Sequence, residues 1–246
     1  MTQPPFILAI CCAVLEDEVR HFAAGLPQVR DIVILPQGLH NEPQRLRREL
    51  QAAVDGAEAR PEITAIALAY GSCGRGVEGI RHDRCPLVIA RAHDCVTLLL
   101  GDKDRYAAYL RDHPGTYWYS PGWIKCAVAP GPDRTETLRR EYTAKFGPEE
   151  AAYLMEVEQQ WMANYNRATY VGLGLGETDK DVAYTRHCAD CLKWNFDRVR
   201  GDPALLTDLL AGRWDEGRFL VVPPGHAIQL TADNAVLRAV PAAPAP

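Results

Sequence analysis

The sequence predicts an α/β fold with a mainly parallel sheet and helices on both of its faces. Two observations predict it. Short apolar runs alternate with amphipathic helical patterns along most of the 246 residues. The runs are also hydrophobic throughout rather than at every second position, which is typical of parallel strands buried on both faces. Strands that alternate with helices favour strand–helix–strand units.

Six segments are short, apolar and rich in residues that strands prefer. The first, residues 6–11, has no charged residue and ends in cysteine. We expect strands at residues 6–11, 31–35, 63–69, 87–91, 168–173 and 219–222.

The segments between these runs carry apolar residues at helical spacing. We expect helices at residues 15–24, 43–54, 96–112, 149–165, 179–194 and 204–210. In the helix over residues 179–194, Cys188 and Cys191 share a face, and we interpret them as core residues rather than metal or redox ligands.

The order of these elements indicates one domain over residues 1–239 with a doubly wound, flavodoxin- or Rossmann-like sheet. The segment Ala129-Pro130-Gly131-Pro132 interrupts the pattern, and a helical excursion follows near residues 135–165. Two similar halves, 1–125 and 166–239, are the alternative organisation. Residues 240–246 contain only Val, Pro and Ala and are predicted to be a disordered tail.

Composition excludes several classes of function. The net charge of −5 does not favour a nucleic-acid partner or an anionic membrane. The first twelve residues have no basic start, and their apolar run is too short to span a bilayer. We therefore expect a cytoplasmic protein.

The chain has eight cysteines, which are unlikely to serve as structural disulfides in a reducing compartment. Clustered cysteines in such a protein favour metal binding or catalysis. Cys85 and Cys126 lie beside apolar segments and are interpreted as small buried hydrophobes.

Three expected strands end in cysteine-containing segments. The first runs into Cys11-Cys12, the third into a turn with Cys73, and the fourth into Arg91-Ala92-His93-Asp94-Cys95. Because sites in open α/β sheets form at the carboxyl ends of the strands, we expect these side chains to converge. Thiols of neighbouring strands, about 4.8 Å apart, can reach one zinc ion with bonds of about 2.3 Å.

The predicted ligands are Cys12, Cys73 and Cys95, with His93 as a fourth ligand or a proton shuttle. Cys12 is preferred to Cys11 because strand alternation directs Cys11 into a face of the sheet.

Neighbouring residues are candidate helpers. Arg91 is expected to hold an anionic substrate, Tyr70 to assist catalysis, and Asp94 to orient His93. Glu16 and Glu18 are candidates too, although acids are common in a first helical turn.

Glycines surround Cys73. Gly71, Gly74 and Gly76 give the backbone the freedom to approach a cofactor closely, and a helix beginning near Val77 would direct N–H groups at it. G-x-G-x-x-G occurs at residues 74–79, but no ribose-binding acid follows at the expected distance, so a dinucleotide site is not predicted.

Two further segments were weighed. The aromatic segment at residues 114–123 is either a loop that walls the site or a packed irregular crossing. Residues 223–226, Pro-Pro-Gly-His, follow the last expected strand and are predicted to border the same edge.

The sequence resembles a bacterial and archaeal family, the domain of unknown function numbered 1638. The resemblance covers roughly residues 6–230 and rests on Ala69-Tyr70-Gly71-Ser72-Cys73-Gly74, Arg91-Ala92-His93-Asp94-Cys95, Pro114-Gly115-Thr116-Tyr117-Trp118, Pro121-Gly122-Trp123 and Phe219-Leu220-Val221-Val222-Pro223-Pro224-Gly225. It implies no established activity, but such proteins look like companions of corrinoid-dependent methyl transfer, and Cys188 and Cys191 lie outside the family pattern. The His93-x-Cys95 pair is also similar to the zinc site of methyltransferases that activate a thiol.

These observations predict a metal-dependent enzyme, a transferase or lyase, that uses zinc to activate a thiol or another small anionic substrate. An iron–sulfur protein with an open iron site is the close alternative. A non-enzymatic metallochaperone or assembly partner for a corrinoid protein is the third, and a metal-free enzyme with Cys95 as nucleophile is disfavoured.

Overall fold

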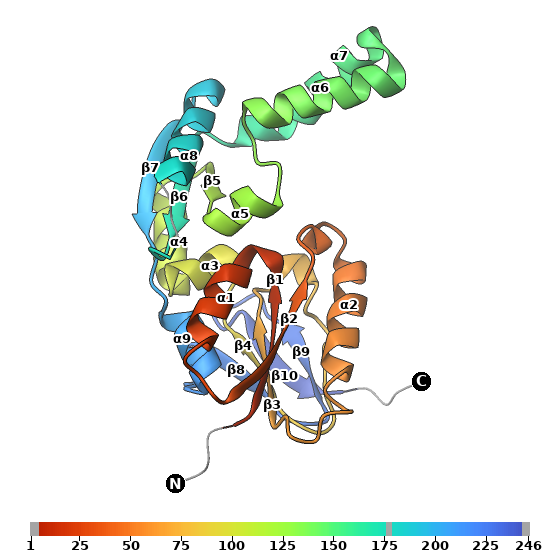
Figure 1. The fold of residues 1–246 in the computed structure, drawn as a ribbon, viewed down its shortest axis with the longest axis vertical. Helices are drawn as coiled ribbons and strands as arrows, with labels where there is room; N and C mark the ends of the chain where they lie inside the picture. Colours follow the sequence, from red (N-terminus) through yellow and green to blue (C-terminus); the bar gives the residue numbers. More distant parts are fainter. Residues whose placement is uncertain (1–4, 176–178, 243–246) are drawn as a thin grey trace. The chain divides into compact units, whose positions relative to one another are not determined.

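The computed structural model describes residues 5–175 and 179–242, which fall into two compact units (Figure 1). Unit 1 comprises Met1–Tyr106 and Gly201–Pro246, and unit 2 is Ala107–Arg200. These boundaries differ from the halves 1–125 and 166–239 considered from the sequence. One domain over residues 1–239 stays a prediction.

Unit 1 contains a mostly parallel five-stranded sheet in the order β2-β1-β3-β4-β8. Its strands are β1 (Ile7–Cys12), β2 (Val29–Leu35), β3 (Ala65–Ala69), β4 (Leu87–Ala90) and β8 (Phe219–Val222). β1 to β4 run parallel to their neighbours, and β8 pairs antiparallel with β4. Every residue of β1, β3 and β4 is buried, as their uniformly apolar sequences predict. The α/β class is therefore confirmed, with the first, third and fourth predicted strands side by side.

The helices of unit 1 bury one apolar stripe each. They are α1 (Glu16–Ala23), α2 (Pro43–Asp55), α3 (Cys95–Leu100), α9 (Ala204–Ala211) and α4 (Lys103–Asp112), which runs on into unit 2. In α2, Leu46, Leu50 and Val54 recur every four residues and are wholly buried. α1 packs against α9 and the sheet, and α2 packs against β1 and β2.

The helix predicted over residues 96–112 is divided at Gly101. This glycine has a φ of 78°, and an added Cβ would lie 2.6 Å from the Cβ of Asp202. A left-handed glycine typically ends a helix, which explains the break between α3 and α4.

The connection from β3 to β4 contains only a short 3-10 helix, η3 (Cys73–Arg75). The helix predicted near Val77 is wrong, because residues 76–79 form turns. This segment instead lies beside β9 (His226–Leu230): Gly79 N donates to Ile228 O at 2.7 Å, and Ile228 N donates to Ile80 O at 3.0 Å.

The carboxyl end of β8 lies at the opposite sheet edge from the one predicted. Because β8 is antiparallel to β4, its last residue Val222 pairs with Leu87, the first residue of β4. Residues 223–226 therefore do not border the cysteine edge. β9 pairs with β10 (Leu237–Pro241), so residues 240 and 241 belong to a strand rather than to a tail, and residues 243–246 lie outside the described part.

Unit 2 contains a parallel three-stranded sheet in the order β5-β6-β7. Its strands are β5 (Thr116–Tyr119), β6 (Arg167–Gly172) and β7 (Asn195–Arg200). Its helices are α5 (Pro121–Cys126), α6 (Pro132–Phe146), α7 (Pro148–Gln159), η4 (Gln160–Asn164) and α8 (Asp179–Leu192). α6, α7 and η4 fill the helical excursion that the sequence predicts.

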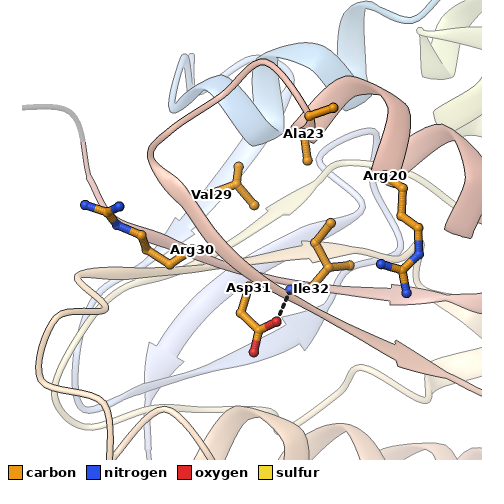
Figure 2. A pocket seen from close by; sticks show the side chains of 7 residues that line it. Arg20, Ala23, Val29, Arg30, Asp31 and Ile32 are labelled. Carbon is orange, nitrogen blue, oxygen red and sulfur yellow. Dashed lines mark hydrogen bonds between the residues drawn. The ribbon is translucent and has the colours of Figure 1, made fainter.

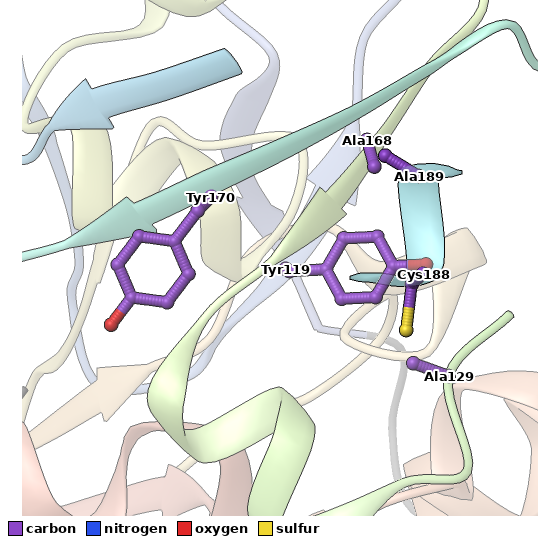
Figure 3. Packing of buried hydrophobic residues seen from close by; sticks show 6 residues of the cluster. All are labelled: Tyr119, Ala129, Ala168, Tyr170, Cys188 and Ala189. Atoms are coloured by element: carbon purple, nitrogen blue, oxygen red, sulfur yellow. The ribbon is translucent and has the colours of Figure 1, made fainter. Parts of the chain in front are cut away.

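The core of unit 2 forms between its sheet and α8. Figure 3 shows Tyr119 and Tyr170 with Ala168 of the sheet, Cys188 and Ala189 of α8, and Ala129. Cys188 is wholly buried there, in agreement with its interpretation as a core residue. The aromatic segment at residues 114–123 is a strand and a short helix rather than a loop.

No helix in residues 5–175 and 179–242 is long and apolar enough to cross a membrane.

Candidate functional site

The candidate site lies at the carboxyl ends of three neighbouring strands of unit 1. In the β1–β3 register, Cys11 pairs with Ala69, so Cys12 and Tyr70 occupy the next positions of the two chains. Both are buried: Cys12 is 8% exposed and Tyr70 is 3% exposed. Ordinary parallel pairing thus brings a thiol and a phenol to the same edge.

Backbone contacts tie the segment after β3 to the segment after β4. Ser72 N donates to Ala92 O at 2.9 Å, and Cys73 N donates to His93 O at 3.2 Å. The Ser72 hydroxyl donates to His93 O at 2.8 Å. The backbone of Cys73 is therefore fixed beside the segment that carries His93 and Cys95.

Gly71 makes this approach possible. A Cβ at this position would lie 2.5 Å from the Cα and N of Asp94, closer than side-chain atoms can come to backbone. The position requires glycine because of this contact, whether or not a cofactor binds.

The backbone at Cys73 is unusual. Cys73, Gly74 and Arg75 all have positive φ, at 44°, 60° and 76°. A non-glycine residue held in this region costs about 1–3 kcal/mol, and such residues concentrate at functional sites. This strain makes Cys73 a stronger candidate than a cysteine in an ordinary turn.

The three thiols act on one another electrostatically. Burial, followed by the Asp94 carboxylate and the Cys12 thiol, raises the pKa of Cys73 to about 12. Burial, followed by Asp94, Cys73 and Cys12, raises the pKa of Cys95 well above its usual value. In this environment the cysteines are neutral thiols near pH 7, and a bound cation is what would hold them as thiolates.

The structure also distinguishes Cys12 from Cys11. Cys12 is the thiol that raises the pKa of both Cys73 and Cys95. Burial raises the pKa of Cys11, and after Cys12 the nearby acids of α1, Glu16 and Glu18, add to this rise. The preference for Cys12 as the site residue therefore has structural support.

Tyr70 lies among these thiols. Burial, followed by Cys12, Cys73, Cys11 and Cys95, raises its pKa, so the phenol stays protonated. Its hydroxyl is buried and has no hydrogen-bond partner in the described part of the chain.

No ready-made coordination sphere is present. Within the described residues, no group of three or more His, Cys, Asp or Glu side chains is arranged so that it could hold a metal ion. The backbone brings the three cysteines to one edge, and their use as ligands stays a prediction.

His93 and Asp94 are not coupled as predicted. His93 is exposed, with its ring 6.4 Å from that of Tyr106. Asp94 accepts from Thr97 N at 2.9 Å as the N-cap of α3, and from the Tyr106 hydroxyl at 2.7 Å. Because its oxygens serve these partners, the prediction that Asp94 orients His93 is not supported.

Arg91 has a different task from the one predicted. Its guanidinium donates to three carbonyl oxygens, those of Glu216 at 2.9 Å, Ala235 at 2.8 Å and Leu237 at 2.6 Å. It therefore joins the end of β4 to the C-terminal segments, and this arrangement does not support its role as an anion clamp.

The other glycines of this segment have structural explanations. An added Cβ on Gly76 would lie 2.3 Å from Cδ2 of Leu46 on α2, and Gly74 has the left-handed φ already noted. Their part in binding a cofactor stays a prediction.

Sequence reasoning missed His40. It belongs to η2 (Leu39–Asn41), just beyond the end of β2, and η2 contacts η3. The His40 carbonyl lies 3.6 Å from where a Cβ of Gly74 would be. Since β2 neighbours β1 in the sheet, its position after a strand end was the signal that could have found it.

A second polar cluster was also missed. His82, 3% exposed, has its Nδ1 3.4 Å from Cys85 Sγ and its Nε2 3.1 Å from a Glu58 carboxylate oxygen. Cys85 N donates to the same Nδ1 at 3.1 Å. These residues precede β3 and β4, so this cluster occupies the opposite edge of the sheet.

His82→Ala is expected to lower the free energy of unfolding by about 1–3 kcal/mol, because it leaves the buried Cys85 N–H without its acceptor. Urea denaturation measures this change. Metal content is expected to stay at the wild-type level, and its loss would contradict the separation of the two clusters.

The remaining cysteines and hollows do not add to the site. Cys191 is exposed, 3.8 Å from a ring nitrogen of His187, while Cys188 is in the core. Figure 2 shows a hollow of about 290 Å³ lined by residues of α1 and β2, including Arg20, Arg30 and Asp31, and by none of the three candidate ligands.

The fold and this edge define an α/β protein with a buried cysteine cluster at the strand ends. The chain belongs to the family described as Protein of unknown function (DUF1638), whose model matches residues 34–210. The predicted resemblance is thus confirmed, and the match includes Tyr70, Cys73, His93 and Cys95. No curated protein and no solved structure matches the chain.

Proposed function

We propose that this chain is a metalloprotein in which Cys12, Cys73 and Cys95 bind a thiophilic metal centre. The observation that carries the proposal is their position at three adjacent strand ends, where each raises or shares in the raised pKa of the others. Buried thiols that repel one another's charge are stabilised as thiolates by a metal cation.

The donor set limits the metal. Thiolate ligands favour zinc, copper(I) and iron–sulfur clusters over the harder cations. Three thiolates leave one position for an external ligand, either on zinc or on one iron of a cluster. We propose zinc first and the cluster second, with His93 at the exposed side of the centre as a proton shuttle or fourth ligand.

The proposed activity is that of an enzyme acting on a small substrate, with a thiol as the preferred class. A metal in this position would act as a Lewis acid and lower the pKa of a bound thiol, as methyl transfer to sulfur requires. A corrinoid protein is the proposed macromolecular partner, in the cytoplasm.

We also propose that the sheet of unit 1 is doubly wound. The chain moves one way from β1 to β2 and the other way from β2 to β3, so right-handed connections put α1 and α2 on opposite faces. In such sheets the strand-end crevice is the usual binding position, which agrees with the proposed centre.

Cys73→Ser and Cys95→Ser are each expected to abolish metal retention, because serine cannot supply a thiolate. Elemental analysis and acid-labile sulfide, measured on protein purified without oxygen, test this and distinguish zinc from a cluster. Cys85→Ser and Cys191→Ser are the controls and are expected to keep the full metal content. Equal metal content in Cys73→Ser and wild-type protein would refute the proposal.

A further inference from the structure

Tyr70 is the most unusual polar group at the cysteine edge. It is 3% exposed, and its hydroxyl has no hydrogen-bond partner within the described residues. Leaving a buried polar group without a partner costs about 1–3 kcal/mol, so such a group calls for an explanation. An ion or ligand that brings an acceptor is one of the standard explanations.

Its place in the fold names the acceptor. Tyr70 follows β3 at the register position next to Cys12, and three residues before Cys73. We infer that the Tyr70 hydroxyl donates a hydrogen bond to a metal-bound cysteine sulfur of this centre, and so acts as a positioning residue that stabilises the metal-loaded state. This inference rests on the proposed function and extends it to a residue outside the ligand set.

The chemistry of sulfur explains why the partner is missing without metal. A neutral thiol is a weak hydrogen-bond acceptor. Metal binding requires the thiolate, and hydrogen bonds to charged groups are roughly twice as strong as those between neutral groups. A phenol is protonated near neutral pH and can therefore donate to this thiolate.

Two opposite effects follow for Tyr70→Phe. The metal-free protein loses a buried hydroxyl that lacks a partner, so its Tm is expected to rise by about 2–4 °C. The metal-loaded protein loses a hydrogen bond to a ligand, so metal affinity is expected to fall about 10–100-fold. A hydroxyl with a purely structural role would not change the two states in opposite directions.

The test uses the full-length protein, stripped of metal and titrated with zinc against a competing chelator. Cobalt(II) is a second probe, because its thiolate-to-metal charge-transfer band reports hydrogen bonding to sulfur and is expected to shift in Tyr70→Phe. If the protein is isolated with iron and sulfide, the same comparison is made on the cluster, by its absorption and its rate of loss to chelator.

Tyr119→Phe is the matched control. Tyr119 is also buried, but its hydroxyl donates to Pro130 O at 2.6 Å in the core of unit 2. Its removal is expected to lower the Tm and to leave metal affinity unchanged.

The outcomes separate the inference from the proposed function. If wild-type protein binds metal and Tyr70→Phe binds it with equal affinity, the inference is overturned and the proposed function stands. A fall in the Tm of metal-free Tyr70→Phe, as in Tyr119→Phe, also overturns it, because the hydroxyl then has a partner without metal. If wild-type protein neither contains iron nor binds zinc or cobalt, both fail.

Discussion

Gly71→Ala is expected to lower the free energy of unfolding of this protein by about 3–5 kcal/mol and to remove bound metal. The new methyl group would meet the N and Cα of Asp94 at 2.5 Å and its carbonyl carbon at 2.8 Å. These are backbone atoms, so no side-chain rotation relieves the contact. The segment that carries Cys73 would have to separate from the one that carries Cys95.

Gly25→Ala is the matched control. Nothing lies within 4 Å of a Cβ built at Gly25, and its φ is not positive. Alanine there is expected to change the free energy of unfolding by no more than about 1 kcal/mol, and in the stabilising direction. Urea denaturation and metal analysis of both variants check the prediction. A Gly71→Ala protein with wild-type stability would show that the two strand ends are not in tight contact.

The cysteine edge was predictable because it depends only on local patterns. Uniformly apolar runs indicate parallel strands, and parallel strands place their last residues at one edge. Cys12, Cys73 and Cys95 follow three such runs, so their approach required no knowledge of side-chain contacts. The neighbouring order of β1, β3 and β4 then confirmed that these ends are adjacent.

The sheet of unit 2 was only partly predictable, for two different reasons. β5 is rich in aromatic residues and lies between Pro114 and Pro121, a pattern equally typical of a loop. β7 carries charged residues at alternate positions, and most of its residues are not fully buried. Strand pairing with β6 defines both, and pairing is a property of residues far apart in the chain.

Tyr70 and Arg91 mark the limit of sequence reasoning at the site. Both were expected to face a substrate because they flank the cysteines. The direction of each side chain, however, depends on neighbours that the local sequence does not contain. For Arg91 these are carbonyl groups 125 to 146 residues later in the chain.

Arg91→Ala is accordingly expected to destabilise the protein rather than to weaken substrate binding. The guanidinium makes three hydrogen bonds to the carbonyls of Glu216, Ala235 and Leu237. Hydrogen bonds from charged groups contribute about 1.5–3 kcal/mol each and are not fully additive, so we expect a loss of about 3–5 kcal/mol. Metal content per folded chain is expected to stay at the wild-type level.

Arg91→Lys and Arg45→Ala complete this experiment. A lysine ammonium cannot reproduce the planar fork that reaches carbonyls on separate segments, so Arg91→Lys is expected to recover little stability. Arg45 is 50% exposed and pairs with Glu42 at 3.2 Å on the surface, so Arg45→Ala is expected to cost no more than about 1 kcal/mol. Urea denaturation measures all three variants. If Arg91→Ala kept its stability but lost metal or anion binding, Arg91 would return to the site as the cation that balances the thiolates.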